Sequence, residues 1–441
     1  MISLQESYKK LSYLNFLSSK LFLCLRLLRI NLNKNKDLNY TLKTIFYTFL
    51  LMFCLSCSDD EHVNTINIDT PTTYSFLRDG ASTVSFDGQT TRIKMATELV
   101  NAMNDSGQSS TDLIEMYSNQ TSTGTAADPF TDESLNASTK SIKSKVAASA
   151  DLFSTNATEA VEIKAKIQSW IIAQTEEVFQ NFETLAEAGM AGQIADGSSV
   201  RYVNSKGLEY NQAVNKSIIG ALMIDQICNN YLSPIVLDEA DNINNNDATI
   251  TEDGKTYTNM EHKWDEAYGY LFGLSTDASD PIATLGEDSF LNKYLSRVND
   301  DADFAGIANE IFDALRIGRA AIVAGAYDVR DEQAEIIKDK LAQVIAARAI
   351  YYLQNGKIAL ASQDFGGAFH DLSEGFGFIY SLRFVRAANS FESLFSSAEV
   401  SSYISQLMEN DGFWSVSPTT LDSISEVIAA KFDFTVAQAA E

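Results

Sequence analysis

A stretch of sequence that occurs twice determines the expected fold: HKWDEAYGYLFGL at residues 262–274 and HDLSEGFGFIYSL at residues 370–382. Histidine, glutamate, glycine and leucine occupy the same positions in both copies, and aromatic residues flank the shared glycine. Each copy follows a long segment with the apolar spacing of a helix. We therefore expect a duplicated helix–loop–helix unit, at about 207–274 and 330–386.

The rest of the sequence is typical of a mainly α protein, with only 5 prolines in 441 residues. Thr73–Phe76 and Thr83–Phe86 alternate with period two on either side of Asp79-Gly80, which predicts a small β-hairpin. Residues 192–207 suit either a turn or a strand pair. The expected fold is mainly α, with duplicated helical bundles after a small N-terminal β-hairpin and longer helices near residues 141–153, 158–184, 207–231, 258–274, 303–325, 330–355 and 365–386.

An export signal with a lipid attachment site is predicted near the start of the chain. Ile45–Leu55 is a run of 11 weakly polar or apolar residues after Lys43, which suits a signal peptide and is too short to span a bilayer. Ser56 and Cys57 then resemble a lipobox, in which the cysteine thiol is acylated and becomes the new N-terminus. Cys57 is therefore the predicted lipidation site, with an ordinary signal peptide or a core helix as the alternative.

The residues after Cys57 favour localisation to the outer membrane. Ser58–Glu61 resembles the acidic export tag of surface lipoproteins of the Bacteroidota, although a solvated linker has the same composition. We expect an outer membrane lipoprotein, anchored to the membrane by its lipid and exposed at the cell surface, or otherwise facing the periplasm. The expected parts are a signal peptide with an over-long start (1–56), a lipidated cysteine and tether (57–70), a β-hairpin and first helix (71–104) and a helical bundle domain (105–441).

The charge of the chain excludes one class of partner. The formal net charge is −26, so the surface repels nucleic acid and tolerates cations. Of the 4 cysteines, only Cys57 and Cys228 would remain after processing, which excludes a disulfide framework. No Ser-His-Asp arrangement, phosphate loop or dinucleotide motif stands out in the sequence, so none of these chemistries is assigned.

The repeated stretch carries the one candidate metal site. His262 and Glu266 are four residues apart and lie on one helix face, with Asp265 beside them, and His370 and Glu374 repeat this spacing. Imidazole nitrogen and carboxylate oxygen suit iron, manganese or zinc. If the bundle brings the two helices together, a single site of two histidines and two glutamates results. The alternatives are plain helix contacts worth about 0.2–0.5 kcal/mol each, or a duplication without a surviving site.

Arg316, Arg319 and Arg348 lie on predicted helices rich in alanine. In a helical bundle such arginines usually pair with carboxylates, and binding of an anion is the alternative. Both interpretations stay open for each of the three residues.

Several strings together resemble an uncharacterised lipoprotein domain family of marine and gut bacteria, over roughly residues 70–440. They are Thr73–Phe76, Arg201–Gln212, Glu261–Tyr270, Gly318–Gly325 and His370–Leu382. That family is similar to the imelysins, which are helical periplasmic or surface proteins with a Gly-x-His-x-x-Glu motif and a link to iron uptake. The resemblance implies two related helical bundles, a role in iron or haem acquisition, and a TonB-dependent receptor or an imelysin as partner.

The chain departs from the imelysin motif around both histidines. Met260 and Ala368 stand where the motif has glycine, and Asp265 and Ser373 stand where it has glutamate. The motif therefore carries over only in part, with His262 and Asp265 matching its metal-binding pair.

Three hypotheses follow for the function. The first is a lipoprotein that binds iron, another divalent metal such as zinc or manganese, or an iron-bearing ligand, and assists an uptake system. The second is an imelysin-type metal-dependent hydrolase, in which Glu266 is the general base. The third is a non-catalytic interaction or scaffold lipoprotein, whose repeat serves packing only. Whether the chain is an enzyme stays open, and the first hypothesis is preferred.

Overall fold

Helices make up most of the structure, which confirms the predicted mainly α class. The computed structural model describes residues 67–387 and 389–441. The predicted signal peptide and Cys57 lie outside the described residues. Within the described residues, no helix combines the length and the apolar character that a membrane crossing requires.

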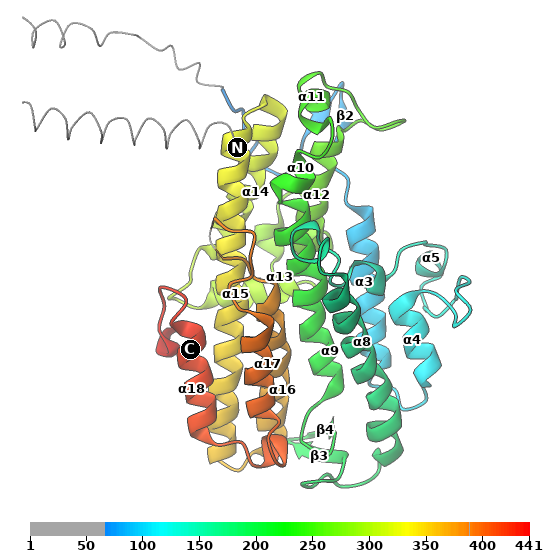
Figure 1. Ribbon diagram of the computed structural model, residues 1–441, viewed down its shortest axis with the longest axis vertical. Helices are drawn as coiled ribbons and strands as arrows, with labels where there is room; N and C mark the ends of the chain where they lie inside the picture. The colour runs from blue at the N-terminus through cyan, green and yellow to red at the C-terminus, as the bar shows by residue number, and fades with distance from the viewer. Residues whose placement is uncertain (1–66, 388) are drawn as a thin grey trace, which may run out of the picture. The chain divides into compact units, whose positions relative to one another are not determined.

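The first part of the described chain runs from the N-terminal hairpin to η4 (Figure 1). Its elements are β1 (Leu77–Arg78), β2 (Ala81–Ser82), α3 (Asp87–Ala102), α4 (Ser110–Ser118), α5 (Glu133–Asn136), α6 (Ile142–Lys145), α7 (Ala150–Phe153), α8 (Ala157–Ala173), the π-helix η1 (Gln174–Val178), the 3₁₀ turn η2 (Phe179–Asn181), β3 (Gly192–Asp196), β4 (Ser199–Val203), α9 (Tyr210–Ile218) and the π-helices η3 (Ile219–Ile224) and η4 (Ile227–Tyr231).

The second half contains both copies of the repeated stretch, in α12 and α16. Its elements are α10 (Pro234–Leu237), α11 (Asn242–Asp247), α12 (Asn259–Phe272), η5 (Pro281–Thr284), α13 (Leu291–Asp300), α14 (Ile307–Ala324), α15 (Tyr327–Ala361), α16 (Phe365–Ser381), η6 (Leu382–Phe384), α17 (Ser397–Leu407), η7 (Gly412–Trp414), α18 (Pro418–Ala429) and α19 (Val436–Ala439).

Both hairpins follow from local sequence. Asp79 and Gly80 have positive φ (51° and 80°), as a two-residue hairpin turn requires, and β1 pairs with β2 around them. The paired strands are shorter than the predicted arms, since each has two residues. Residues 192–203 form a second antiparallel pair, β3 with β4, so the strand-pair alternative for this segment is the correct one.

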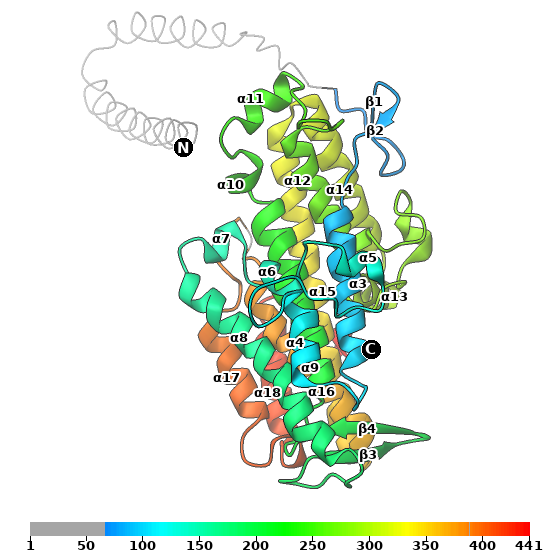
Figure 2. The ribbon, with the colours of Figure 1, turned by 90° about the vertical axis from the view of Figure 1, so that its right-hand side faces the viewer.

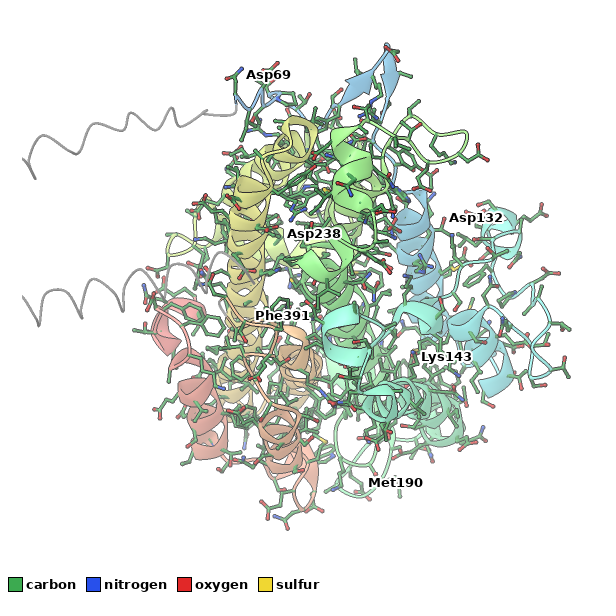
Figure 3. All side chains as sticks on the ribbon, turned by 45° about the horizontal axis from the view of Figure 1, so that its top comes forward. Asp69, Asp132, Lys143, Met190, Asp238 and Phe391 are labelled. Atoms are coloured by element: carbon green, nitrogen blue, oxygen red, sulfur yellow. The ribbon has the colours of Figure 1, made fainter. Side chains whose placement is uncertain are left out.

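One helical column connects the two copies of the repeat. Helix α9 continues through η3 and η4 to Tyr231, and most of its side chains are buried. Helix α16 packs against α9 and η3, whereas α12 packs against η4. A Cβ on Gly220 would lie 2.4 Å from the Cβ of Ser381, so only glycine allows this crossing of η3 with α16. Side chains fill the space between the helices, and their apolar parts form one core (Figure 3).

The copies begin at opposite ends of this helical body. Helix α12 starts beside α11 and close to β2, where the Thr256 hydroxyl donates to the carbonyl of Ser82. Helix α16 starts against β3, where Gly366 contacts the backbone of Ala195. Figures 1 and 2 show the two hairpins at the two ends of the helices, each next to one copy of the repeat.

Candidate functional site

The first histidine of the repeat is held by the segment that follows β2. His262 Nδ1 lies 3.0 Å from the carbonyl oxygen of Ser85, and its ring stacks on Tyr257 with centroids 4.6 Å apart. Burial lowers the pKa of His262 and outweighs the opposite effect of Glu266. The carboxylate of Glu266 accepts a hydrogen bond of 2.9 Å from Gln89. Both predicted ligands of this turn therefore have protein partners.

Both carboxylate oxygens of Asp265 accept hydrogen bonds from protein groups. Its Oδ1 accepts hydrogen bonds from Arg319 Nε (3.0 Å) and the Tyr74 hydroxyl (2.8 Å), and its Oδ2 accepts from the Ser85 amide (3.2 Å). The side chains of Asp265 and Arg319 are fully buried. Burial raises the pKa of Asp265 to about 6, although Arg319 beside it acts to lower the pKa. Asp265 thus joins α12 to α14 and to the hairpin segment.

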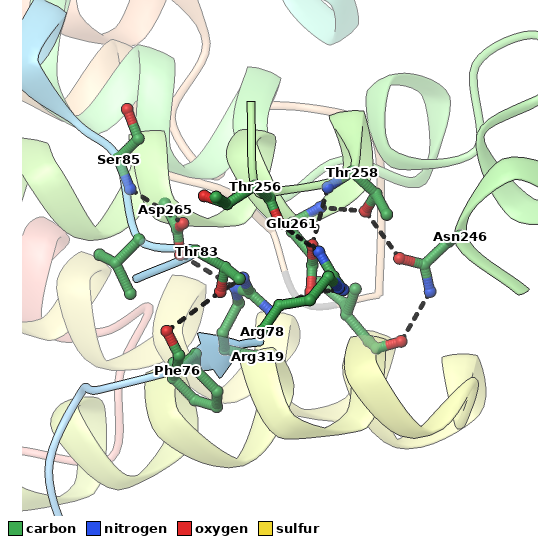
Figure 4. A network of polar contacts seen from close by, with 12 residues as sticks. Phe76, Arg78, Thr83, Ser85, Asn246, Thr256, Thr258, Glu261, Asp265 and Arg319 are labelled. Atoms are coloured by element: carbon green, nitrogen blue, oxygen red, sulfur yellow. Dashed lines mark hydrogen bonds and ion pairs between the residues drawn. The ribbon is translucent and has the colours of Figure 1, made fainter. Parts of the chain in front are cut away.

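Glu261 completes this buried network (Figure 4). It pairs with Arg319 Nη1 at 3.0 Å and accepts two hydrogen bonds of 3.0 Å from the guanidinium of Arg78 on β1. It also accepts from the Thr258 amide in a capping box that begins α12. Nη2 of Arg319 donates to the Thr83 hydroxyl at 2.9 Å. The network is fully partnered around one guanidinium, which is typical of a structural ion-pair cluster.

The second histidine lies between two carboxylates. His370 Nδ1 is 3.0 Å from Glu209 Oε1, and His370 Nε2 is 3.6 Å from Glu374 Oε1. Because the carboxylates flank opposite nitrogens of one ring, the three groups do not face a common point. Glu374 also pairs with Lys216 at 3.2 Å and accepts a hydrogen bond from the Tyr294 hydroxyl at 3.2 Å. Burial alone would raise the pKa of Glu374, but Lys216 and His370 bring it down to about 2.

The surroundings of the two turns are equivalent in a way that the sequence does not reveal. The amide of Ser85, just before α3, donates to Asp265, and the amide of Glu209, just before α9, donates to the hydroxyl of Ser373 at 2.9 Å. Asp265 and Ser373 are each the third residue after a histidine. The segment before α3 therefore donates a backbone hydrogen bond to α12, and the segment before α9 donates the equivalent hydrogen bond to α16.

The shared glycines confirm this equivalence. A Cβ on Gly269 would lie 2.4 Å from the Cβ of Phe86, at the start of α3. A Cβ on Gly377 would lie 2.4 Å from the Cβ of Lys216, in α9. Each glycine therefore permits close packing against a different helix, and neither brings α12 and α16 together.

The single site of two histidines and two glutamates is not formed. The helices that carry the two turns begin at opposite ends of the helical body (Figures 1 and 2). Within residues 67–387 and 389–441, no group of three or more His, Cys, Asp or Glu side chains is arranged to hold a metal ion. Metal binding by either turn alone stays a prediction.

A polar cavity of about 230 Å³ adjoins the second turn. Glu209, which His370 holds in place, forms part of its wall. Gln174 is buried and donates to the carbonyl of Met103, but its side-chain oxygen has no hydrogen-bond partner among the described residues. The cavity lies between the end of α3, η1, β4 and the start of α9, and is lined by Asn104, Gln174, Val200, Arg201, Tyr202, Glu209, Asn211 and Gln212.

Sequence reasoning did not identify this cavity. Its wall combines residues 200–212 with Asn104 and Gln174, which are distant in the chain, and amide side chains carry no distinctive motif. The string Arg201–Gln212 contributes most of the lining residues, and its resemblance to other sequences was the one available signal.

Comparison with known proteins gives a family and no function. No curated protein and no solved structure matches the chain. Residues 71–435 match the family model described as a domain of unknown function, DUF4856, and this span includes both turns and the cavity. Since the match covers most of the chain, the protein belongs to the DUF4856 family.

Proposed function

We propose that this protein is an exported, lipid-anchored binding protein of the outer membrane, whose ligand site is the polar cavity beside Glu209. The observation that carries the proposal is the cavity itself, in which all lining residues except Val200 are polar. A buried amide oxygen without a partner, as in Gln174, costs about 1–3 kcal/mol unless a ligand or water donates to it. A ligand with several hydrogen-bonding groups is therefore favoured.

The size of the cavity limits the ligand. A volume of about 230 Å³ lies below the usual range of about 300–1,000 Å³ for sites that enclose a drug-sized molecule. The cavity suits a small polar molecule or one polar group of a larger ligand, and its lining does not suit the large apolar face of haem. A small polar chelate of iron is a ligand of this kind.

The role in iron uptake is the finer part of the proposal. It is supported by the resemblance to Bacteroidota lipoproteins and to imelysins, and by an acidic chain that attracts cationic species. A TonB-dependent receptor or an imelysin is the proposed partner. The enzyme alternative, a metal-dependent hydrolase, needs a metal with an open position and a general base. The scaffold alternative leaves the polar cavity without a use.

A thermal-shift experiment tests the cavity. We expect the neutral ferric complex of acetohydroxamate, or the metal-free ligand, to raise the Tm of the purified protein. Glu209→Gln should remove this rise, because the carboxylate lines the cavity. Glu187→Gln, an exposed acid of the same region, is the matched control and should keep the rise. The proposal fails if neither solute raises the Tm, or if the rise is equal in Glu209→Gln.

A second candidate is metal binding at the first turn alone. His262 Nδ1 contacts a backbone carbonyl, which is how metal-ligating histidines are commonly oriented, and this leaves Nε2 available next to Glu266. The turn supplies two protein ligands, so solvent would have to complete the coordination of an iron, zinc or manganese ion.

A further inference from the structure

Arg348 on α15 is a buried arginine without a counter-ion. The residue is 5% exposed, and its guanidinium carbon lies 3.9 Å from the ring centroid of Tyr351 and 4.5 Å from that of Tyr352. Among residues 67–387 and 389–441 it forms no ion pair, and its Nε and Nη2 atoms have no hydrogen-bond partner. The aromatic rings cover the guanidinium, but they do not accept its in-plane N–H groups.

Other buried arginines of the described chain are compensated. Arg319 pairs with two carboxylates, Arg386 pairs with Asp151, and Arg330 pairs with Asp238 at 2.7 Å. Arg92 donates to the backbone carbonyls of Ser141 and Gly88. Because the fold provides acceptors in these four cases, the unpartnered edge of Arg348 calls for a specific explanation.

Two further cations from α13 surround the same aromatic cluster. Arg297 lies 5.5 Å from the Tyr294 centroid and donates to the Tyr352 hydroxyl at 2.7 Å. Lys293 Nζ lies 5.7 Å from the Tyr294 centroid. Arg297 is exposed and Lys293 is half-buried, so both cations lie nearer the surface than the buried guanidinium of Arg348.

None of the nearby carboxylates forms an ion pair with Arg348 among the described residues. Glu374 pairs with Lys216 and His370, and its charge also attracts Arg297. Asp371 acts on Arg348 only through a longer-range attraction. Asp288 accepts backbone hydrogen bonds at the start of α13 and attracts Lys293. Neither aspartate forms an ion pair with the cluster cations among the described residues. The Nε and Nη2 edge of Arg348 therefore stays without an anionic partner among the described residues.

We propose that Arg348, with Arg297 and Lys293, binds an oxyanion, either a carboxylate or a phosphate group. The Nε–H and one Nη2–H lie parallel along one edge of the planar guanidinium, and this edge matches two oxygens of such a group. Tyr351 is half-buried and covers the guanidinium, so its ring turns aside when the anion binds. This site shares no lining residue with the cavity beside Glu209, and the two proposals can fail separately.

Isothermal titration calorimetry of the full chain tests the site with inorganic phosphate and, separately, with acetate at constant ionic strength. We expect one of the two anions to bind, which also identifies the group that the site prefers. Arg348→Met should weaken binding at least about tenfold, since both parallel donors are lost. Arg297→Met, at the exposed rim, should weaken binding by a smaller factor.

Arg316→Met is the matched control, because Arg316 also stacks on an aromatic ring, Phe312, but lies outside the cluster. Its affinity for the anion should equal that of the unmodified protein. Arg348→Met should also unfold at an equal or higher temperature without anion, since it removes an unpaired buried charge. Failure of both anions to bind, or equal binding by Arg348→Met, overturns the proposal. If Arg348→Met does not fold, unchanged affinity in both Arg297→Met and Lys293→Met overturns it instead.

Discussion

Replacing Arg319 with methionine should destabilise the protein strongly, because this guanidinium is the centre of the buried network at the first hairpin. Methionine retains much of the side-chain volume but donates no hydrogen bond. Asp265 then loses its ionic partner at 3.0 Å and keeps only Tyr74 and an amide as donors. Glu261 is affected less, since it keeps both hydrogen bonds from Arg78.

The expected loss follows from the burial of the carboxylate left behind. Removing one partner of a buried ion pair typically costs about 3–5 kcal/mol, and Asp265 is fully buried. For a chain of this length such a loss lowers the Tm by about 5 °C. Arg316→Met, one turn earlier on α14, removes an arginine paired with the largely exposed Asp313 and should cost no more than about 1 kcal/mol.

The pH dependence gives a second test of the same reasoning. The pKa of Asp265 in the folded protein is raised to about 6, above the ordinary range of an aspartate, so its contribution to stability is present at low pH and is lost as the pH rises through 6. Without Arg319 this pKa rises further. The variant should therefore regain part of its stability between pH 8 and pH 5, relative to the unmodified protein.

Urea denaturation followed by circular dichroism, at pH 8 and pH 5, measures both effects. The double variant Arg319→Met with Asp265→Asn should recover part of the loss at pH 8, because the uncompensated charge is gone. A loss below about 1 kcal/mol for Arg319→Met at pH 8, or a loss equal to that of Arg316→Met, would refute the assignment of this network to stability.

Three other outcomes are expected. Glu374→Gln should cost about 3 kcal/mol at pH 7, since the Glu374 pKa of about 2 favours folding above pH 4.5 and Lys216 loses its partner; acid titration of stability should show the difference vanish toward pH 2. Metal titration should give at most one ion per turn, so His262→Ala and His370→Ala should each remove their own ion without affecting the other; equal stoichiometry in all variants removes the metal hypothesis. Cys57→Ala should abolish labelling by palmitate and move the protein from the membrane to the soluble fraction; unchanged labelling would contradict lipidation at this residue.

The sequence predicts the ends of helices well where the signal lies in neighbouring residues. The capping box of Thr258 and Glu261 predicts the start of α12 to within one residue. By contrast, the helix predicted near residues 330–355 does not end at residue 355, and α15 continues to Ala361. Gly356 lies inside the helix and packs closely against α16, where a Cβ would be 2.6 Å from the side chain of Leu372. Such tertiary packing overrides the helix-breaking tendency of glycine, and a single sequence does not show it.

At the candidate site, too, contacts within one helix could be predicted from the sequence, whereas packing between helices could not. The four-residue spacing correctly places His370 beside Glu374. Of the two interpretations left open for Arg319, pairing with a carboxylate is the one that the structure shows. The sequence does not show that α12 and α16 pack against different helices, since both copies look alike. The sequence also does not show that Asp265 forms an ion pair with Arg319, because this pairing depends on the packing of α12 against α14.

A motif that is present twice gives a protein two places in which to vary, and here the third residue after each histidine has a different role. In the α12 copy, Asp265 is committed to Arg319, so drift at that position endangers the whole fold. In the α16 copy, the corresponding Ser373 accepts a single amide hydrogen bond, and the residue that donates it, Glu209, faces the cavity. Substitution at Ser373 would therefore alter the wall of the proposed ligand cavity at one end, while substitution at Asp265 would act on stability at the other.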